Sequence, residues 1–140
     1  MSAVVLLDTG PWVALHCRDE QHHPWSSAQF AQHPGPFLTC EAVVAETCFL
    51  LARCGFDPSR ALAMIERGVV RVGMSLVDEI AAVSRLFDKY DKVPASLADA
   101  CLIRLSELYD RSRVLTLTLD SDFHIYRRHG RKTIPLIRPD

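Results

Sequence analysis

The sequence predicts an α/β protein in three layers, with a short, mostly parallel β-sheet flanked by helices. Two apolar runs carry this prediction: residues 3–7 and residues 114–119 have the character of buried strands, and each is followed at once by an acid. Helical patterns fill most of the chain between them, and strands separated by helices are typical of parallel sheets. We therefore expect about five short strands in a single domain that spans residues 1–140.

Glycine, proline and capping residues set the expected boundaries in the first half of the chain. A cluster of helix breakers at residues 33–36 precedes a short strand, and Thr39 is a candidate N-cap for the helix that follows. Gly55 is a natural stop for that helix, because glycine readily adopts the left-handed conformation that ends many helices. The expected elements are a strand at 3–7, helices at 11–16 and 25–32, a strand at 37–38 and an apolar helix at about 41–53.

The second half of the chain repeats this alternation. Residues 57–58 and 75–78 match two signals for the start of a helix, a proline at the first helical position and a capping box. Pro135 indicates that the last strand lies at a sheet edge, because proline has no N–H to donate to a neighbour. The expected elements are a helix from 58 to 68, a strand at 69–72, a helix through 80–87, a helix opened by 96–99, a strand at 114–119, a short helix at 125–129 and a strand at 133–137.

Composition and charge exclude several classes of protein. Hydrophobic residues make up 49% of the chain and the net charge is −1, which is ordinary for a globular domain and gives no polycation effect. The five cysteines form no Cys-x-x-Cys pair, which favours free thiols over a disulfide framework or a zinc site. No apolar run approaches the length that spans a membrane, so we expect a soluble cytoplasmic protein.

The last twenty residues are locally basic. They hold five Lys or Arg residues against two acids, and two interpretations remain open. The basic side chains could belong to a solvated helix end, or they could form a rim that contacts phosphates. The five are Arg127, Arg128, Arg131, Lys132 and Arg138.

Four acids are placed so that they could converge. Asp8 and Asp120 follow the two strand-like runs, and the carboxyl ends of parallel strands meet at the sheet edge where ligands of α/β proteins bind. Glu46 interrupts the apolar pattern of one helix, and Asp99 lies at the start of another. Clustered carboxylates need a counter-charge, and an all-oxygen ligand set selects Mg²⁺ or Mn²⁺, ions that commonly act on phosphates.

Each acid also has a purely structural interpretation. Asp99 completes a Ser-x-x-Asp capping box with Ser96, and Asp120 and Asp122 could cap a turn before a short helix. Glu46 could lie at the margin of its apolar stripe and reach water. Only the convergence of all four acids favours a shared site over these separate structural roles.

Four short motifs contain these acids. They are Leu-Asp-Thr-Gly-Pro at residues 7–11, Val-Val-Ala-Glu at 43–46, Lys-Tyr-Asp at 89–91 with Ser-Leu-Ala-Asp-Ala at 96–100, and Thr-Leu-Asp-Ser-Asp-Phe at 118–123. In this order and spacing they resemble the motifs of PIN-domain proteins, and more narrowly those of the bacterial VapC-type toxins of VapBC toxin–antitoxin pairs. The resemblance covers nearly the whole chain.

The resemblance implies an activity and a set of partners. The protein would be a Mg²⁺- or Mn²⁺-dependent endoribonuclease that hydrolyses RNA phosphodiesters with a metal-activated water, and the toxin of a type II toxin–antitoxin module. Its partners would be an RNA substrate, a VapB-type antitoxin and a second copy of the chain in a homodimer. The antitoxin's C-terminal segment would insert near the acids.

The resemblance also implies roles for individual residues. The four acids would surround the metal ion, with Asp122 as a fifth acid that binds directly or through water. Two threonine hydroxyls would orient the carboxylates, and the basic tail would supply RNA phosphate contacts. The metal set is Asp8, Glu46, Asp99, Asp120 and Asp122, the orienting residues are Thr9 and Thr118, and the phosphate contacts are Arg127, Arg128, Arg131 and Lys132.

Two alternatives belong to other functional classes. The first is a catalytically silent PIN-fold module that binds RNA or protein, which the complete acidic quartet disfavours. The second is a Mg²⁺-dependent phosphatase or phosphotransferase, which needs a nucleophilic Asp in a D-x-D loop. Thr9-Gly10 follows Asp8, so that loop is absent after the first strand, and Asp120-Ser121-Asp122 comes too late in the chain for the usual arrangement.

Overall fold

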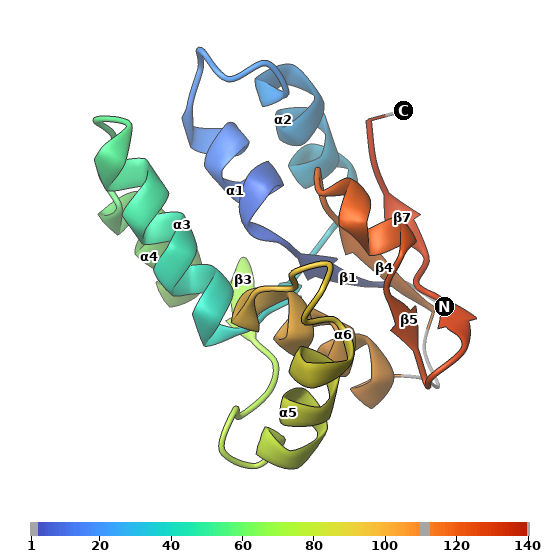
Figure 1. Ribbon diagram of the computed structural model, residues 1–140. Coiled ribbons are helices and arrows are strands. Elements are labelled where there is room, and N and C mark those ends of the chain that lie inside the picture. The colour runs from blue at the N-terminus through green and yellow to red at the C-terminus, as the bar shows by residue number, and fades with distance from the viewer. Residues whose placement is uncertain (1–2, 110–112, 140) are drawn as a thin grey trace.

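The computed structural model of the chain, which describes residues 3–109 and 113–139, has a five-stranded sheet at its centre (Figure 1). Its strands are β1 (Val4–Leu7), β2 (Phe37–Thr39), β3 (Val70–Val72), β4 (Val114–Leu117) and β7 (Leu136–Ile137). They lie in the order β3-β2-β1-β4-β7, and every neighbouring pair is parallel. The predicted parallel α/β architecture is therefore confirmed.

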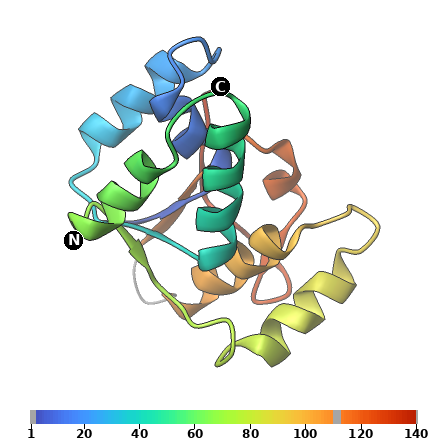
Figure 2. The same ribbon diagram turned by 90° about the vertical axis from the view of Figure 1, so that its left-hand side faces the viewer.

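Helices cover both faces of this sheet. Figures 1 and 2 show α1 and α2 on one side of the sheet and α5 and α6 on the other, while α3 packs against α1, α4 and α6. No helix among the described residues is long and apolar enough to cross a membrane. The helices are α1 (Thr9–His16), α2 (His23–Gln32), α3 (Glu41–Arg53), α4 (Ser59–Glu66), α5 (Ile80–Lys89) and α6 (Leu97–Leu108).

The core lies around the two central strands. Leu6 and Leu7 of β1 point to opposite faces of the sheet because they are adjacent in a strand, and both are fully buried. Leu117 of β4 pairs with Leu7 and is buried to the same extent. Burial on both faces explains why these strands are continuous apolar runs rather than alternating ones.

The C-terminal segment differs from its predicted structure. Residues 125–129 do not form a helix; a 3₁₀ helix, η1 (Ser121–His124), comes earlier, and β5 (Arg127–Arg128) pairs antiparallel with β6 (Lys132–Thr133). Residues 129–131 join these strands, and the positive φ angles of His129 and Gly130, 51° and 80°, reverse the chain instead of continuing a helix. The predicted edge position of the last strand is confirmed, because β7 ends the sheet order immediately after Pro135.

Two predicted helix starts are also displaced. Thr39 is not an N-cap: it is the last residue of β2, and its hydroxyl donates to the carbonyl of Leu7, while Cys40 occupies the N-cap position of α3. The N–H of Asp78 donates to Ser75 Oγ as a capping box requires, but the α-helix begins only at Ile80. In both cases a local signal is used for a turn or a strand contact rather than for a helix.

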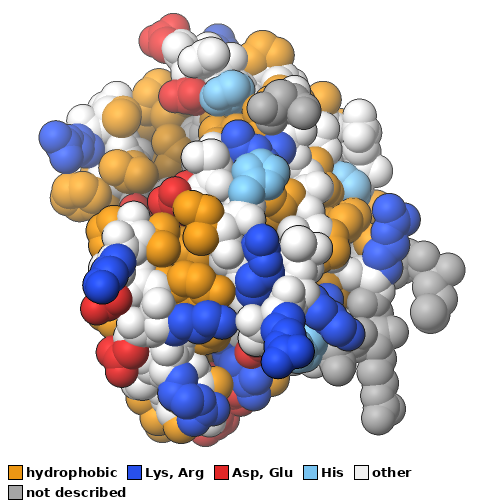
Figure 3. Space-filling model, turned by 45° about the vertical axis from the view of Figure 1, so that its right-hand side comes forward, with side chains coloured by type: hydrophobic (Ala, Val, Ile, Leu, Met, Phe, Trp, Pro, Cys, Tyr) orange, Lys and Arg blue, Asp and Glu red, His pale blue; other side chains and the backbone are white. Residues whose placement is uncertain are grey.

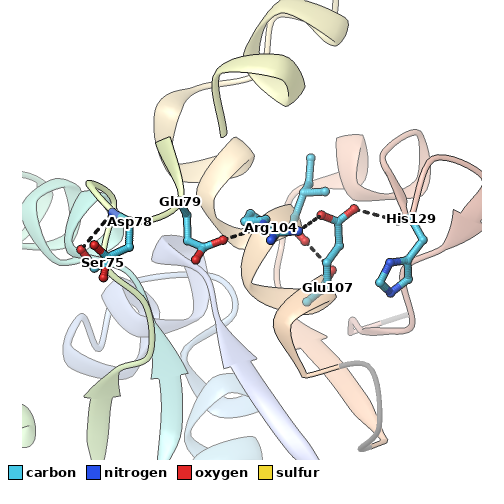
Figure 4. Close-up of polar contacts among 8 residues, drawn as sticks. Ser75, Asp78, Glu79, Arg104, Glu107 and His129 are labelled. Carbon is cyan, nitrogen blue, oxygen red and sulfur yellow. Dashed lines mark hydrogen bonds and ion pairs between the residues drawn. The ribbon is translucent and has the colours of Figure 1, made fainter. Parts of the chain in front are cut away.

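A polar brace fixes α6 to its surroundings (Figure 4). Arg104 of α6 donates to Glu79 before α5 at 2.8 Å and to Glu107 at 3.1 Å. Glu107 in turn accepts a 2.7 Å hydrogen bond from the backbone N–H of His129, in the turn between β5 and β6. The position of the C-terminal hairpin is therefore set by α6.

Candidate active site

A cleft of about 540 Å³ contains all five acids that the sequence analysis singled out. Asp8 follows β1 and Asp120 follows the end of β4, so both stand at the carboxyl edge of the sheet. Glu46 reaches the cleft from α3 and Asp99 from the first turn of α6. The convergence predicted from four separate segments is therefore present in the folded chain, together with Asp122 from η1.

Asp8 is the most enclosed of these acids. Its carboxylate accepts hydrogen bonds from the N–H of Thr9 at 2.8 Å and from the hydroxyl of Thr118 at 2.6 Å. Burial raises the pKa of Asp8 from 3.8 to about 7, although the bonds from Thr118 and Thr9 act in the opposite direction. The nearby carboxylates of Asp99 and Asp120 raise this pKa further.

Both predicted orienting hydroxyls contact carboxylates. Thr118 donates to Asp8 and accepts a 2.9 Å hydrogen bond from the N–H of Asp120, so it connects the two strand ends. Thr9 donates to Glu46 Oε2 at 3.3 Å. Each hydroxyl therefore restricts the orientation of a carboxylate in the cleft.

Asp99 has a structural role and a place in the cleft at the same time. It forms a complete capping box with Ser96 at the start of α6, and its Oδ2 atom also accepts a 2.8 Å hydrogen bond from the hydroxyl of Tyr126. Burial raises the pKa of Asp99, and the hydrogen bonds from Tyr126 and Ser96 lower it. The capping interpretation and the convergence interpretation are thus both correct for this residue.

Asp120 and Asp122 form a second local unit. Asp120 is the N-cap of η1, and its Oδ1 atom accepts a 2.9 Å hydrogen bond from the N–H of Asp122. Both side chains are partly exposed in the cleft. The turn-capping interpretation of this segment is correct, and it positions the two acids beside Asp8 and Asp99.

Two residues of this site, Tyr126 and Glu20, are not predicted from the sequence. Tyr126 is fully buried, its ring packs edge-on against Tyr90 and Phe123, and its hydroxyl donates to Asp99. The sequence places it inside a predicted helix, and no local pattern indicates a contact with a residue 27 positions earlier in the chain. Glu20 lines the cleft from the segment between α1 and α2. That segment is polar without periodicity, so no local pattern separates Glu20 from its solvated neighbours.

The four basic residues of the C-terminal segment do not line the cleft. The guanidinium of Arg127 donates to the carbonyls of residues 124–126, and that of Arg128 donates to the carbonyl of Ser106. Arg131 and Lys132 are exposed at the end of the β5–β6 hairpin. Figure 3 shows that Lys and Arg side chains gather on the face of the molecule that carries β5.

The cleft is an uncompensated patch of negative charge. No Lys or Arg is among the described residues that line it. Within residues 3–109 and 113–139, no three His, Cys, Asp or Glu side chains are placed to hold one metal ion together. A hydrated cation that contacts one or two carboxylates and reaches the others through water fits this arrangement better than a fully dehydrated one.

The raised pKa of Asp8 predicts how the stability of the metal-free protein depends on pH. Between about pH 4 and pH 7 the folded chain keeps a proton on Asp8 that the unfolded chain has lost, so the free energy of unfolding falls as pH rises through this window. Asp8→Asn should remove this component, which amounts to at most about 4 kcal/mol. Urea unfolding in EDTA at pH 4.5 and pH 8 measures it. If Asp8→Asn kept the full wild-type pH dependence, Asp8 would not be its source. Asp91→Asn, which changes an exposed acid, is the control and should keep that dependence.

Comparison with known proteins identifies the family of the fold. A family model described as the PIN domain matches residues 5–128. The fold is similar to the crystal structure of VapC20 from Mycobacterium tuberculosis, described as a sarcin-ricin loop cleaving toxin, with a TM-score of 0.67, 24% identity and coverage of 84% of this chain and 91% of that chain. A search of curated proteins gives no significant match. Because the family model spans most of the chain and all five acids, the chain belongs to the PIN-domain family.

Proposed function

We propose that this protein is a metal-dependent endoribonuclease and the toxin of a type II toxin–antitoxin module. The observation that carries the proposal is the convergence of five carboxylates in one cleft of a PIN domain. The similarity of fold to a protein described as a sarcin-ricin loop cleaving toxin supports it. The site of action would be the cytoplasm, where RNA and a VapB-type antitoxin are available.

The carboxylates fit a hard divalent cation. Burial and mutual repulsion raise the pKa values of Asp8 and Asp99, and a Mg²⁺ or Mn²⁺ ion would provide the counter-charge that they lack. Asp8 and Asp99 would hold the ion, with Glu46, Asp120 and Asp122 reached directly or through water. When bound, such an ion lowers the pKa of a water and stabilises charge on phosphate oxygens.

The chain's own residues would prepare this site before RNA binds. Thr118 and Thr9 hold the carboxylates of Asp8 and Glu46 in fixed orientations. Tyr126 holds Oδ2 of Asp99 from the buried side. These contacts limit the reorganisation that binding would require, which is how hydrogen-bonded partners of ligands raise metal affinity.

Loss of single acids should separate catalysis from folding. Asp8→Asn and Asp99→Asn should abolish cleavage of RNA in Mg²⁺ or Mn²⁺, and Thr118→Val should lower metal affinity or activity by about 10–100-fold. Asp91→Asn, which changes an exposed acid outside the cleft, is the matched control and should cleave normally. Gel assays with and without EDTA, with circular dichroism to check folding, measure these effects. Cleavage at the wild-type rate by both Asp variants would refute the site.

Expression in cells tests the toxin assignment. The wild-type protein alone should arrest growth, the Asp99→Asn variant should be harmless at equal protein level, and co-expression of a cognate antitoxin should restore growth. Growth rate and immunoblots give the readout. If the protein cleaves RNA in vitro but its expression does not slow growth, the nuclease assignment would stand and the toxin assignment would be contradicted.

The exposed basic residues should contribute salt-dependent RNA binding. Arg131→Ala and Lys132→Ala should weaken binding of single-stranded RNAs of different sequence equally. The slope of log affinity against log salt concentration should fall by about 0.7 for each lost phosphate contact. Arg67→Ala, at the exposed end of α4, is the control because α4 and β5 lie on opposite sides of the molecule (Figure 1). Filter binding at several salt concentrations measures the slopes, and unchanged slopes would remove this hairpin from the RNA interface.

A further inference from the structure

Two cysteines from distant parts of the chain form a buried pair. Cys40 is the N-cap residue of α3 and Cys101 lies in α6, and each side chain is only 2% exposed. The two thiols lie close enough to interact, because the neighbouring Cys101 thiol raises the pKa of Cys40 and Cys40 lowers the pKa of Cys101. The pair lies where the beginning of α3 meets α6, two elements that are in contact and adjacent in both ribbon views (Figures 1 and 2).

A small cavity adjoins this pair. It has a volume of about 50 Å³ and is bordered by both cysteines and by Met74, from the segment that follows β3. The remaining lining residues are Glu41, Ala42 and Leu76. This volume exceeds the roughly 10–15 Å³ that one water molecule needs on the same measure, so the cavity has room for a single small ion.

The chemistry of the lining selects one class of ion. Three sulfur-bearing side chains border one small space, and thiolate and thioether ligands favour soft cations such as Cu(I). Structural zinc sites take four ligands, and the described part of the chain contains no group of three His, Cys, Asp or Glu side chains able to hold a metal. Two thiolates are a sufficient ligand set for Cu(I), which accepts low coordination numbers.

We propose that Cys40 and Cys101 form a binding site for one soft monovalent cation of the Cu(I) class, with Met74 beside it. On binding, the cation replaces the two thiol protons, which pass to solvent, and no electrons are transferred. None of these three residues lines the acidic cleft, so the proposal does not depend on nuclease activity. The two sites nevertheless share their supporting helices, since α3 also carries Glu46 and α6 carries Asp99.

Competition for Cu(I) tests the proposal with the reduced, metal-free full chain in the absence of oxygen. The wild-type protein should withdraw one Cu(I) per chain from the coloured Cu(I)–bicinchoninate complex, and Cys40→Ser and Cys101→Ser should each lose this uptake. The matched control is the double variant Cys17→Ser with Cys54→Ser, which changes a second neighbouring pair at the C-caps of α1 and α3. The control should retain the wild-type uptake.

A second measurement needs no variant and covers the case in which a serine variant fails to fold. The wild-type protein with and without Cu(I) is treated with a thiol-alkylating reagent during unfolding, and its peptides are analysed by mass spectrometry. Cu(I) should delay alkylation of Cys40 and Cys101 but not of Cys54. The proposal would be overturned if the wild-type protein took up no Cu(I), or if the control variant lost uptake to the same extent as the Cys40 and Cys101 variants. Protection of other cysteines in place of this pair, or tight binding of Zn²⁺ through the same pair, would also overturn it.

Discussion

The hydrogen bond from Thr118 to Asp8 joins the ends of the two central strands, and the acidic cleft depends on it. β1 and β4 pair in parallel from Val4 with Val114 to Leu7 with Leu117, so the next residue of each strand emerges at the same edge. The Thr118 hydroxyl donates to Asp8 at 2.6 Å and accepts from the N–H of Asp120. One side chain therefore sets the relative positions of two acids separated by more than a hundred residues in the sequence.

The electrostatics of the cleft follow from this packing. Asp8 is buried and lies near the carboxylates of Asp99 and Asp120, and hydrogen bonds from Thr118 and Thr9 offset only part of the resulting rise in its pKa. Burial likewise raises the pKa of Asp99, and hydrogen bonds from Tyr126 and Ser96 offset part of this rise. Burying negative charge without a counter-charge costs stability, and strongly shifted pKa values are concentrated at functional sites. The cleft therefore combines carboxylates in fixed orientations with negative charge that no Lys or Arg of its described lining compensates.

Much of the fold could be predicted because its local patterns agree with its tertiary contacts. The parallel character of the sheet, the alternation of strands with helices and the edge position of the last strand follow from apolar runs, Gly and Pro positions and caps. Two of the failures are at residues 125–129, where the first strand of a hairpin replaces a predicted helix, and at Thr39, whose hydroxyl donates a hydrogen bond to the Leu7 carbonyl. In both places a contact from elsewhere in the chain overrides the local preference.

The sequence by itself determined the class of the fold and the acids that would meet, because strand ends and helix starts are marked by their own residues. Tertiary structure alone decided that Tyr126 holds Asp99, that Glu20 enters the cleft and that Arg127 and Arg128 are tied to carbonyls. It also brought Cys40 beside Cys101. These contacts depend on how helices and loops pack around the sheet. Neither periodicity nor a local motif indicates which side chains from distant parts of the sequence come into contact.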